Sequence, residues 1–238
     1  MKVRGVKAIF FDIGSTLYNV EIKECPLWCT AISEKLRDLG INVSANDVLN
    51  AFKNAREELK MLFAPNELWY LAILSLTLKK LGIVPKPKVT MIIYRVFTKT
   101  FSKSFKLKTE AKEALKTLKD MGLKIGIISN SSSNDVVYEA LIKDNLEEYI
   151  DVLVTSQQIS WKKPNPRIFH YACELLSVKP QEAVHVGDNP YADILGSKKA
   201  GLMAIQIITK NNKPSPYADF VVHNLSEIPE IIKTIKTF

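Results

Sequence analysis

A short hydrophobic segment near the start of the chain ends abruptly at a carboxylate. Residues Ala8 to Phe11 are all apolar, with no polar residue between them. Unbroken runs of this kind are typical of strands buried on both faces, as in parallel sheets covered by helices. Asp12 follows directly, and a carboxylate beside a buried strand is unfavourable unless it is paired. The pattern predicts a central strand whose carboxyl end carries either a reactive aspartate or a simple polar turn.

The spacing of apolar residues then changes from a continuous run to one in every three or four. This helical period persists over residues 18–105 and predicts four helices joined by short connections, which favours a small bundle. The expected helix starts lie at Leu27, Ser44, Pro65 and Pro87. No strand of the main sheet is expected there, so residues 18–105 are predicted to form a cap domain inserted into the core.

Short apolar runs alternate with helical patterns in the rest of the chain. The further strands are expected at residues 123–128, 152–154, 183–186, 202–208 and 220–222. Repeated alternation of strands and helices implies a parallel sheet with right-handed crossovers. The predicted fold is therefore α/β: a Rossmann-like parallel-sheet core of residues 1–17 and 106–238, with the four-helix cap between its two parts.

Polar side chains follow three of these strands. Asp12 follows the first strand, the pair Ser129-Asn130 the second and the pair Gly187-Asp188 the strand at 183–186. Because parallel strands bring their carboxyl ends to one edge, these groups should meet in one crevice. Asp193 lies about one helical turn beyond Asp188 and can point back to the same place. Carboxylates this close repel one another unless a cation joins them, and oxygen-only ligands suit Mg²⁺.

Composition narrows the class of protein. The 238 residues carry a net charge of +8 and only three cysteines, too few and too sparse for a disulfide framework. The lysines are spread over many predicted helices, which suits a solvated surface and a crevice for an anionic substrate, and no nucleic-acid-binding motif accompanies them. No membrane-length apolar run and no signal-peptide pattern is visible, so we predict a cytoplasmic protein, a monomer or homodimer, with no membrane partner.

Four motifs together resemble those of the haloacid dehalogenase-like hydrolases. They are Asp12-Ile-Gly-Ser-Thr-Leu17, Ile128-Ser129-Asn130, Lys163-Pro164-Asn165-Pro166 and Gly187-Asp188 with Asp193. They come in the family's order, and the helical stretch lies where the family inserts its cap. The resemblance implies that Asp12 is a nucleophile that forms an aspartyl intermediate and that Lys163, rather than its neighbour Lys162, neutralises charge.

The same resemblance implies the remaining roles. Ser129 would bind the substrate, and Asn130 either binds it too or shapes the turn. Mg²⁺ would be held by Asp12, the Gly14 carbonyl, Asp188 and Asp193, the last through water or a hydrogen bond. His185 lies in a predicted core strand and is interpreted as structural.

One departure from the family pattern leaves the reaction open. Phosphatases of this family usually carry a second aspartate two residues after the nucleophile, which protonates the leaving group and activates water, and here that position is Gly14. General acid–base help contributes about 10²–10⁴ in rate. Family members that cleave carbon–halogen bonds or phosphonates lack this acid, so a 2-haloacid dehalogenase or phosphonate hydrolase is one alternative.

The fourth motif favours a phosphatase, because Gly187-Asp188 with Asp193 is the family's metal-binding form, which dehalogenases do not need. The sequence therefore predicts a Mg²⁺-dependent phosphatase that acts on a small phosphorylated metabolite. A non-catalytic phosphate-binding regulatory protein on the same fold is the alternative from another class.

Overall fold

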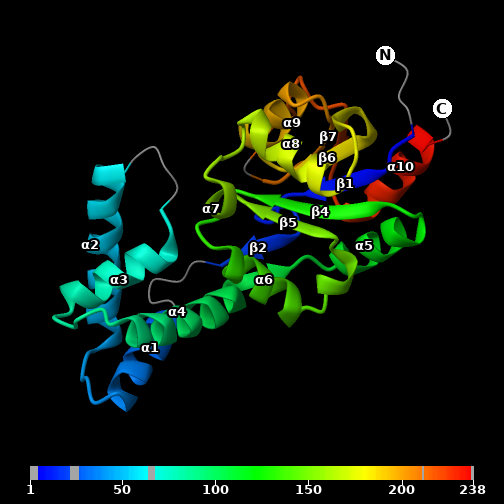
Figure 1. Cartoon of the computed structure of the whole chain (residues 1–238). Coiled ribbons are helices and arrows are strands. Elements are labelled where there is room, and N and C mark those ends of the chain that lie inside the picture. The colour runs from blue at the N-terminus through cyan, green and yellow to red at the C-terminus, as the bar shows by residue number, and fades with distance from the viewer. Residues whose placement is uncertain (1–4, 22–26, 64–67, 211, 237–238) are drawn as a thin grey trace. The chain divides into compact units, whose positions relative to one another are not determined.

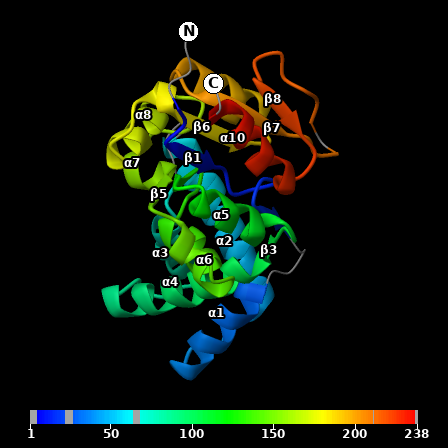
Figure 2. The same cartoon turned by 90° about the vertical axis from the view of Figure 1, so that its right-hand side faces the viewer.

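The structure is a computed structural model that describes residues 5–21, 27–63, 68–210 and 212–236. The chain divides into two compact units, which are described separately (Figures 1 and 2). The core unit contains residues 1–20, 106–131 and 141–238, and the helical unit contains residues 21–105 and 132–140. The domain boundaries given above remain a prediction, and the helical unit includes a segment, 132–140, that the sequence pattern assigns to the core.

A six-stranded parallel sheet forms the centre of the core unit, in the order β5-β4-β1-β6-β7-β8. Its strands are β1 (Ala8–Phe11), β4 (Lys124–Ser129), β5 (Val152–Thr155), β6 (Ala183–Gly187), β7 (Met203–Ile207) and β8 (Phe220–Val222). The chain builds outward from β1 on one side with β4 and β5 and then crosses to the other side with β6. The ligand crevice of an open parallel sheet lies at such a reversal.

The register of the sheet brings the predicted site residues to one edge. Phe11 is the partner of Ile127 on β4 and of Val186 on β6. Asp12, Ile128 and Gly187 are therefore at the same level, one residue further along each strand. Ser129 and Asp188 come next, at the carboxyl edge on either side of β1.

Helices cover both faces of this sheet (Figure 1). Helices α8 and α9 pack together on one face, and α5 lies on the other beside α10. The described helices that lie wholly in the core unit are α5 (Ala111–Asp120), α7 (Ser156–Ile159), α8 (Pro166–Leu175), α9 (Gly196–Lys199) and α10 (Ile228–Lys236). Shorter elements are the 3₁₀ helices η2 (Glu147–Tyr149), η3 (Pro180–Glu182) and η5 (Leu225–Glu227) and the π-helix η4 (Pro190–Leu195). Coverage on both faces explains why the strands read as continuous apolar runs.

Close packing beneath α8 holds β1 in the middle of the sheet. Phe10 on β1 and Phe169 on α8 are fully buried in one apolar cluster. A side chain at Gly126 of β4 would meet the Phe10 ring at 2.6 Å, closer than real Cβ atoms approach. Glycine at position 126 therefore makes room for Phe10 and keeps the strand that carries Asp12 in register.

Four helices build the helical unit: α1 (Leu27–Asp38), α2 (Ala45–Phe63), α3 (Tyr70–Lys80) and α4 (Pro87–Phe101), followed by η1 (Ser102–Ser104). Phe97 of α4 is buried at the centre of an aromatic cluster. Its ring centroid lies 5.2 Å from that of Trp28, 6.0 Å from that of Phe52 and 4.8 Å from that of Tyr70. Aromatic rings at these separations stabilise one another beyond the area that they bury.

The first residues of α6 (Asn134–Lys143) belong to the helical unit. The Tyr94 hydroxyl of α4 donates to the Asp135 carboxylate at 2.5 Å and lies 2.9 Å from the Ser133 hydroxyl. The Tyr70 backbone N–H also donates to the Ser132 carbonyl, at 3.2 Å. Side-chain and backbone hydrogen bonds thus tie the start of α6 to the inserted helices.

The expected α/β fold is confirmed, with all six strands of the sheet and four helices in the inserted stretch. Two short strands were missed, β2 (Tyr18–Val20) and β3 (Phe105–Leu107), which pair with each other in a separate sheet. The helix expected at 191–200 is two pieces, η4 and α9. Pro65, the expected start of the third inserted helix, lies outside the described residues. Among the described residues, no helix is long and apolar enough to cross a membrane.

We predict that Phe97→Ala destabilises the helical unit by about 3–5 kcal/mol, because it leaves a cavity among packed aromatic rings. Denaturant unfolding followed by tryptophan fluorescence measures this, since Trp28 reports from the same cluster. Met91→Ala, on the exposed side of the same helix, should change stability by about 0.5 kcal/mol or less. Equal effects of the two substitutions would contradict the packing described.

Candidate active site

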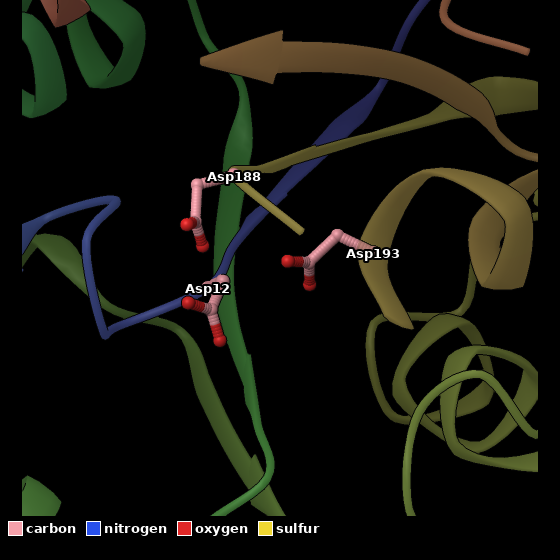
Figure 3. A group of neighbouring side chains, drawn as sticks. All are labelled: Asp12, Asp188 and Asp193. Carbon is pink, nitrogen blue, oxygen red and sulfur yellow. The ribbon is translucent and has the colours of Figure 1, made fainter. Parts of the chain in front are cut away.

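Three aspartates converge at the carboxyl edge of the sheet (Figure 3). Asp12 follows β1, Asp188 follows β6 and Asp193 comes from η4. One carboxylate oxygen from each lies within 4.8 Å of the others. Asp12 and Asp193 are buried, and Asp188 is half-buried. The register of the sheet and the turn of η4 thus bring three negative groups, far apart in the sequence, to one point.

One buried lysine joins two of these carboxylates. The Lys163 Nζ donates to Asp12 Oδ1 and to Asp193 Oδ1, each at 2.6 Å, and to the Ile128 carbonyl at 2.8 Å. These three acceptors occupy all three N–H groups of the ammonium. The other oxygen of Asp12, Oδ2, makes no bond to Lys163. The cation is therefore fixed in place, and one carboxylate oxygen of Asp12 is left available.

Asp193 is held by several donors at once. Besides Lys163, the His185 ring donates to Asp193 Oδ1 with its Nε2 2.9 Å away, and the Asn189 backbone N–H donates to Oδ2 at 3.0 Å. The Asn189 side chain in turn accepts from the backbone N–H groups of Tyr191 and Ala192, near the start of η4. Asp193 is thus a rigid anchor for the lysine rather than a freely moving carboxylate.

Two glycines leave the space that this arrangement needs. A Cβ at Gly187 would lie 2.3 Å from the Asp193 carboxyl carbon, and one at Gly196 would lie 2.8 Å from the Pro164 Cα. A side chain at Gly187 would have to displace the Asp193 side chain, and one at Gly196 would have to displace the Pro164 backbone. Gly187 therefore lets Asp193 reach the edge of the sheet, and Gly196 lets the loop that carries Lys163 pack against α9.

The residues expected to bind substrate lie on the other side of Asp12. Ser129 ends β4, is buried, and its hydroxyl has no hydrogen-bond partner among the described residues. The Asn130 amide is paired with the Lys163 backbone, donating to its carbonyl at 2.9 Å and accepting from its N–H at 2.7 Å. Of the two interpretations of Asn130, the structure gives it a part in shaping the loop. A substrate contact of Asn130 stays a prediction.

Burial and charge shift the ionisation of these groups in different directions. Burial raises the pKa of Asp12, and the attraction of Lys163 only partly counters it. Burial and the Asp193 charge raise the pKa of Asp188 to about 6. Asp193 is buried as well, but Lys163 and the hydrogen bond from His185 outweigh this and hold its pKa well below the usual range. The same lysine therefore accompanies a raised pKa at Asp12 and a lowered pKa at Asp193, because in the described part of the chain only Asp193 accepts hydrogen bonds from further donors.

The histidine beside Asp193 is neutral. Burial lowers the pKa of His185, although Asp193 favours its charged form. Because a carboxylate accepts only, the proton of the neutral ring must be on Nε2. Nδ1 is buried without a partner among the described residues. His185 therefore positions Asp193, a role that agrees with its interpretation as structural.

The charges of the site favour a bound cation. Three carboxylates have one hydrogen-bonded ammonium between them, that of Lys163, and His185 is neutral. No side chain of the described residues hydrogen-bonds to the Asp188 carboxylate, on which Lys108 acts only through its charge. The available donors are all oxygens, the ligands of hard cations such as Mg²⁺. The cluster can hold a metal ion, and the Gly14 carbonyl lies on the turn that follows Asp12.

Comparisons with known proteins agree with this geometry. A sequence model of the haloacid dehalogenase-like hydrolases matches residues 6–201. The chain belongs to this family. It is 26% identical to the glyceraldehyde 3-phosphate phosphatase of Methanocaldococcus jannaschii over 242 residues, 97% of this chain and 99% of that protein. It is 30% identical to the phosphatase of the same name from Methanothermobacter thermautotrophicus, over 85% of each chain.

A solved structure shows the shared fold. The 2-haloacid dehalogenase of Pseudomonas syringae superposes with a TM-score of 0.74 at 22% identity, covering 96% of this chain and 99% of the other. The predictions of a haloacid dehalogenase-like hydrolase and of its Rossmann-like core are confirmed. The relatives named as phosphatases support the prediction of phosphatase activity.

The structure brings together most of the predicted site residues and adds two that the sequence patterns did not indicate. Asp12, Asp188, Asp193 and Lys163 form one cluster, with Ser129 beside it at the same edge. His185 is the first of these two residues. It lies on the same face of β6 as Gly187, because strand side chains alternate, and Asp193 approaches the sheet at Gly187. Asn212, in a polar loop, donates to the Asp188 carbonyl at 2.6 Å and so positions this residue.

We predict that Gly187→Ala lowers hydrolase activity at least about 10²-fold, because the added methyl group displaces Asp193 and with it Lys163. Phosphate release by the purified variant measures the effect. Gly5→Ala is the control, since a Cβ there meets no atom within 4 Å. Normal activity of the Gly187 variant would mean that the position of Asp193 is unimportant.

Proposed function

We propose that this hydrolase is a Mg²⁺-dependent phosphatase that acts on a small phosphorylated metabolite. The observation that carries the proposal is the buried Lys163, which bonds to both Asp12 and Asp193. Beside them lies a third carboxylate, Asp188, which forms no ion pair with a side chain of the described residues. This arrangement leaves one oxygen of Asp12 available at the carboxyl edge of the sheet, beside a fixed cation and a place for a metal ion. The names of the two relatives, both glyceraldehyde 3-phosphate phosphatases, point to the same reaction class.

The residues of the chain act in a definite order. Asp12 Oδ2 attacks phosphorus, the ester oxygen leaves with a proton, and water then cleaves the aspartyl phosphate to regenerate the carboxylate. The Lys163 ammonium holds Asp12 Oδ1 and lies beside the negative charge that develops during transfer. The buried Ser129 hydroxyl donates to a phosphoryl oxygen. Asn130 keeps Lys163 in position through its backbone.

Asp12, the Gly14 carbonyl and Asp188 are the residues that would hold Mg²⁺, with Asp193 behind them. When bound, the ion neutralises the repulsion between the carboxylates and an anionic phosphate group. The absence of other partners of the Asp188 carboxylate among the described residues supports this assignment. The bonds from Lys163, His185 and Asn189 to Asp193 support an indirect role for that residue.

Glyceraldehyde 3-phosphate is the first natural substrate to test, because both relatives are named for it. A three-carbon phosphate is small and strongly anionic, and the chain's net charge of +8 favours its approach.

We predict that the protein releases phosphate from p-nitrophenyl phosphate and from glyceraldehyde 3-phosphate in the presence of Mg²⁺. Asp12→Asn should lower both rates at least about 10³-fold, since it removes the nucleophile. Asp120→Asn, at an exposed position of α5, is the matched control and should keep full activity. Halide release from 2-chloropropionate without metal and without phosphate release would establish a dehalogenase instead. Phosphate binding without turnover would indicate the regulatory alternative.

A further prediction concerns metal binding and pH. Because the pKa of Asp188 is raised from 3.8 to about 6, this group makes the metal-free protein less stable as the pH rises between these two values. Mg²⁺ requires the ionised form, so protons compete with it at lower pH. Added MgCl₂ should therefore raise the unfolding temperature more at about pH 7.5 than at about pH 5. Scanning fluorimetry of the wild type and of Asp188→Asn tests this, and an equal shift in the two proteins would refute the assigned ligand.

A further inference from the structure

The site described so far lacks a proton for the departing oxygen. An alkoxide leaves a phosphate ester readily only when it is protonated as the bond breaks. Lys163 cannot supply this proton, because its three N–H groups are bonded to Asp12, Asp193 and the Ile128 carbonyl. Asp193 is held in its ionised form. Position 14, in the turn that follows Asp12, is a glycine and has no side chain.

A second lysine lies over this turn. The Lys108 Nζ donates to the Ser15 carbonyl, and the Lys108 backbone N–H donates to the Leu17 carbonyl at 3.0 Å. Lys108 is thus attached at both ends to the segment that follows Asp12. The turn itself is tight, since the backbone N–H groups of Leu17 and Tyr18 both donate to the Ile13 carbonyl, at 3.1 and 2.9 Å.

The surroundings of Lys108 suit a proton donor. Its Nζ makes one hydrogen bond among the described residues, so two N–H groups remain for a ligand. Partial burial lowers the pKa of Lys108, while the charges of Asp188 and Glu110, the acidic groups that it faces, oppose this. The bond to the Ser15 carbonyl holds the ammonium at the turn that directly follows Asp12.

We propose that Lys108 is the general acid and base of this enzyme. As Asp12 attacks and the P–O bond of the ester breaks, the Lys108 ammonium gives its proton to the leaving oxygen. The neutral amine then takes a proton from the water that attacks the aspartyl phosphate, which releases inorganic phosphate and restores the ammonium. This inference rests on the proposed phosphatase function and names the residue that completes its proton transfers.

The basicity of the leaving group provides the test. p-Nitrophenolate departs with little need of protonation, whereas phenolate is more basic and needs it. Lys108→Met should therefore lower kcat for phenyl phosphate about 10²–10⁴-fold and kcat for p-nitrophenyl phosphate less than about 10-fold. Lys106→Met, at an exposed position two residues earlier, is the matched control and should leave both rates unchanged.

Lys108→Arg separates proton transfer from charge. Arginine keeps the positive charge and can reach the Ser15 carbonyl, but it does not release a proton near neutral pH. If Lys108 is the acid, the arginine variant should show the same selective loss on phenyl phosphate as Lys108→Met. If Lys108 only holds the turn or attracts the substrate, the arginine variant should resemble the wild type on both esters, which would overturn the proposal.

A carboxylic acid added at position 14 gives an independent check. A Cβ at Gly14 meets no atom within 4 Å, so a side chain can begin there without displacing a neighbour. Gly14→Asp combined with Lys108→Met should restore part of the lost phenyl phosphate activity. Equal losses on the two esters in Lys108→Met, without rescue, would reject Lys108 as the acid and leave the phosphatase function standing. No phosphate release by the wild type would reject both.

Discussion

The ammonium of Lys163 between two buried carboxylates is the interaction on which the site depends. A charge removed from water is unfavourable by several kcal/mol unless a close partner compensates for it. The two partners of this lysine differ in their roles. Asp193 is fixed by His185 and by the Asn189 backbone, and it fixes the lysine. Asp12 receives a share of the same cation through one carboxylate oxygen, and Lys163 does not bond to the other. Rigid anchoring of Asp193 thus leaves one oxygen of Asp12 available, as the proposed reaction requires.

The surrounding fold supplies the precision that this interaction needs. Parallel pairing of β1 and β6 sets Asp12 and Gly187 at one level. Gly187 makes room for the Asp193 side chain, and Gly196 makes room for the loop that carries Lys163. Asn165 accepts from the Arg167 backbone N–H at the start of α8, so this helix begins directly after the Lys163-Pro164 turn. Each of these features is small, but together they hold the Lys163 ammonium in one position. Such precision matters because catalysis tolerates little displacement of the reacting groups.

Much of this could be predicted from the sequence because strong local patterns determine it. The apolar run before Asp12 marks a buried strand, and the order of polar strand ends places Ser129 and Asp188 at the same edge. The partnership of His185 with Asp193 could not be read in this way, because the residue lies inside an apolar strand and its partner comes from the following turn. Strands β2 and β3 have three residues each, too few for an alternating pattern to be visible. The position of the Lys108 side chain depends on a contact across 93 residues of sequence, which no local pattern encodes.

The division of α6 between the two units has a consequence for attempts to exchange caps among related enzymes. Residues 132–140 follow the Ser129 loop in the sequence, yet Tyr94 and Tyr70 of the inserted helices bond to the residues at its start. A chimaera that replaced residues 21–105 alone would remove those tyrosines and leave Ser133 and Asp135 beside foreign side chains. A cap exchange that keeps these hydrogen bonds must therefore transfer two separate segments, residues 21–105 and 132–140, the second of which includes the amino-terminal part of α6.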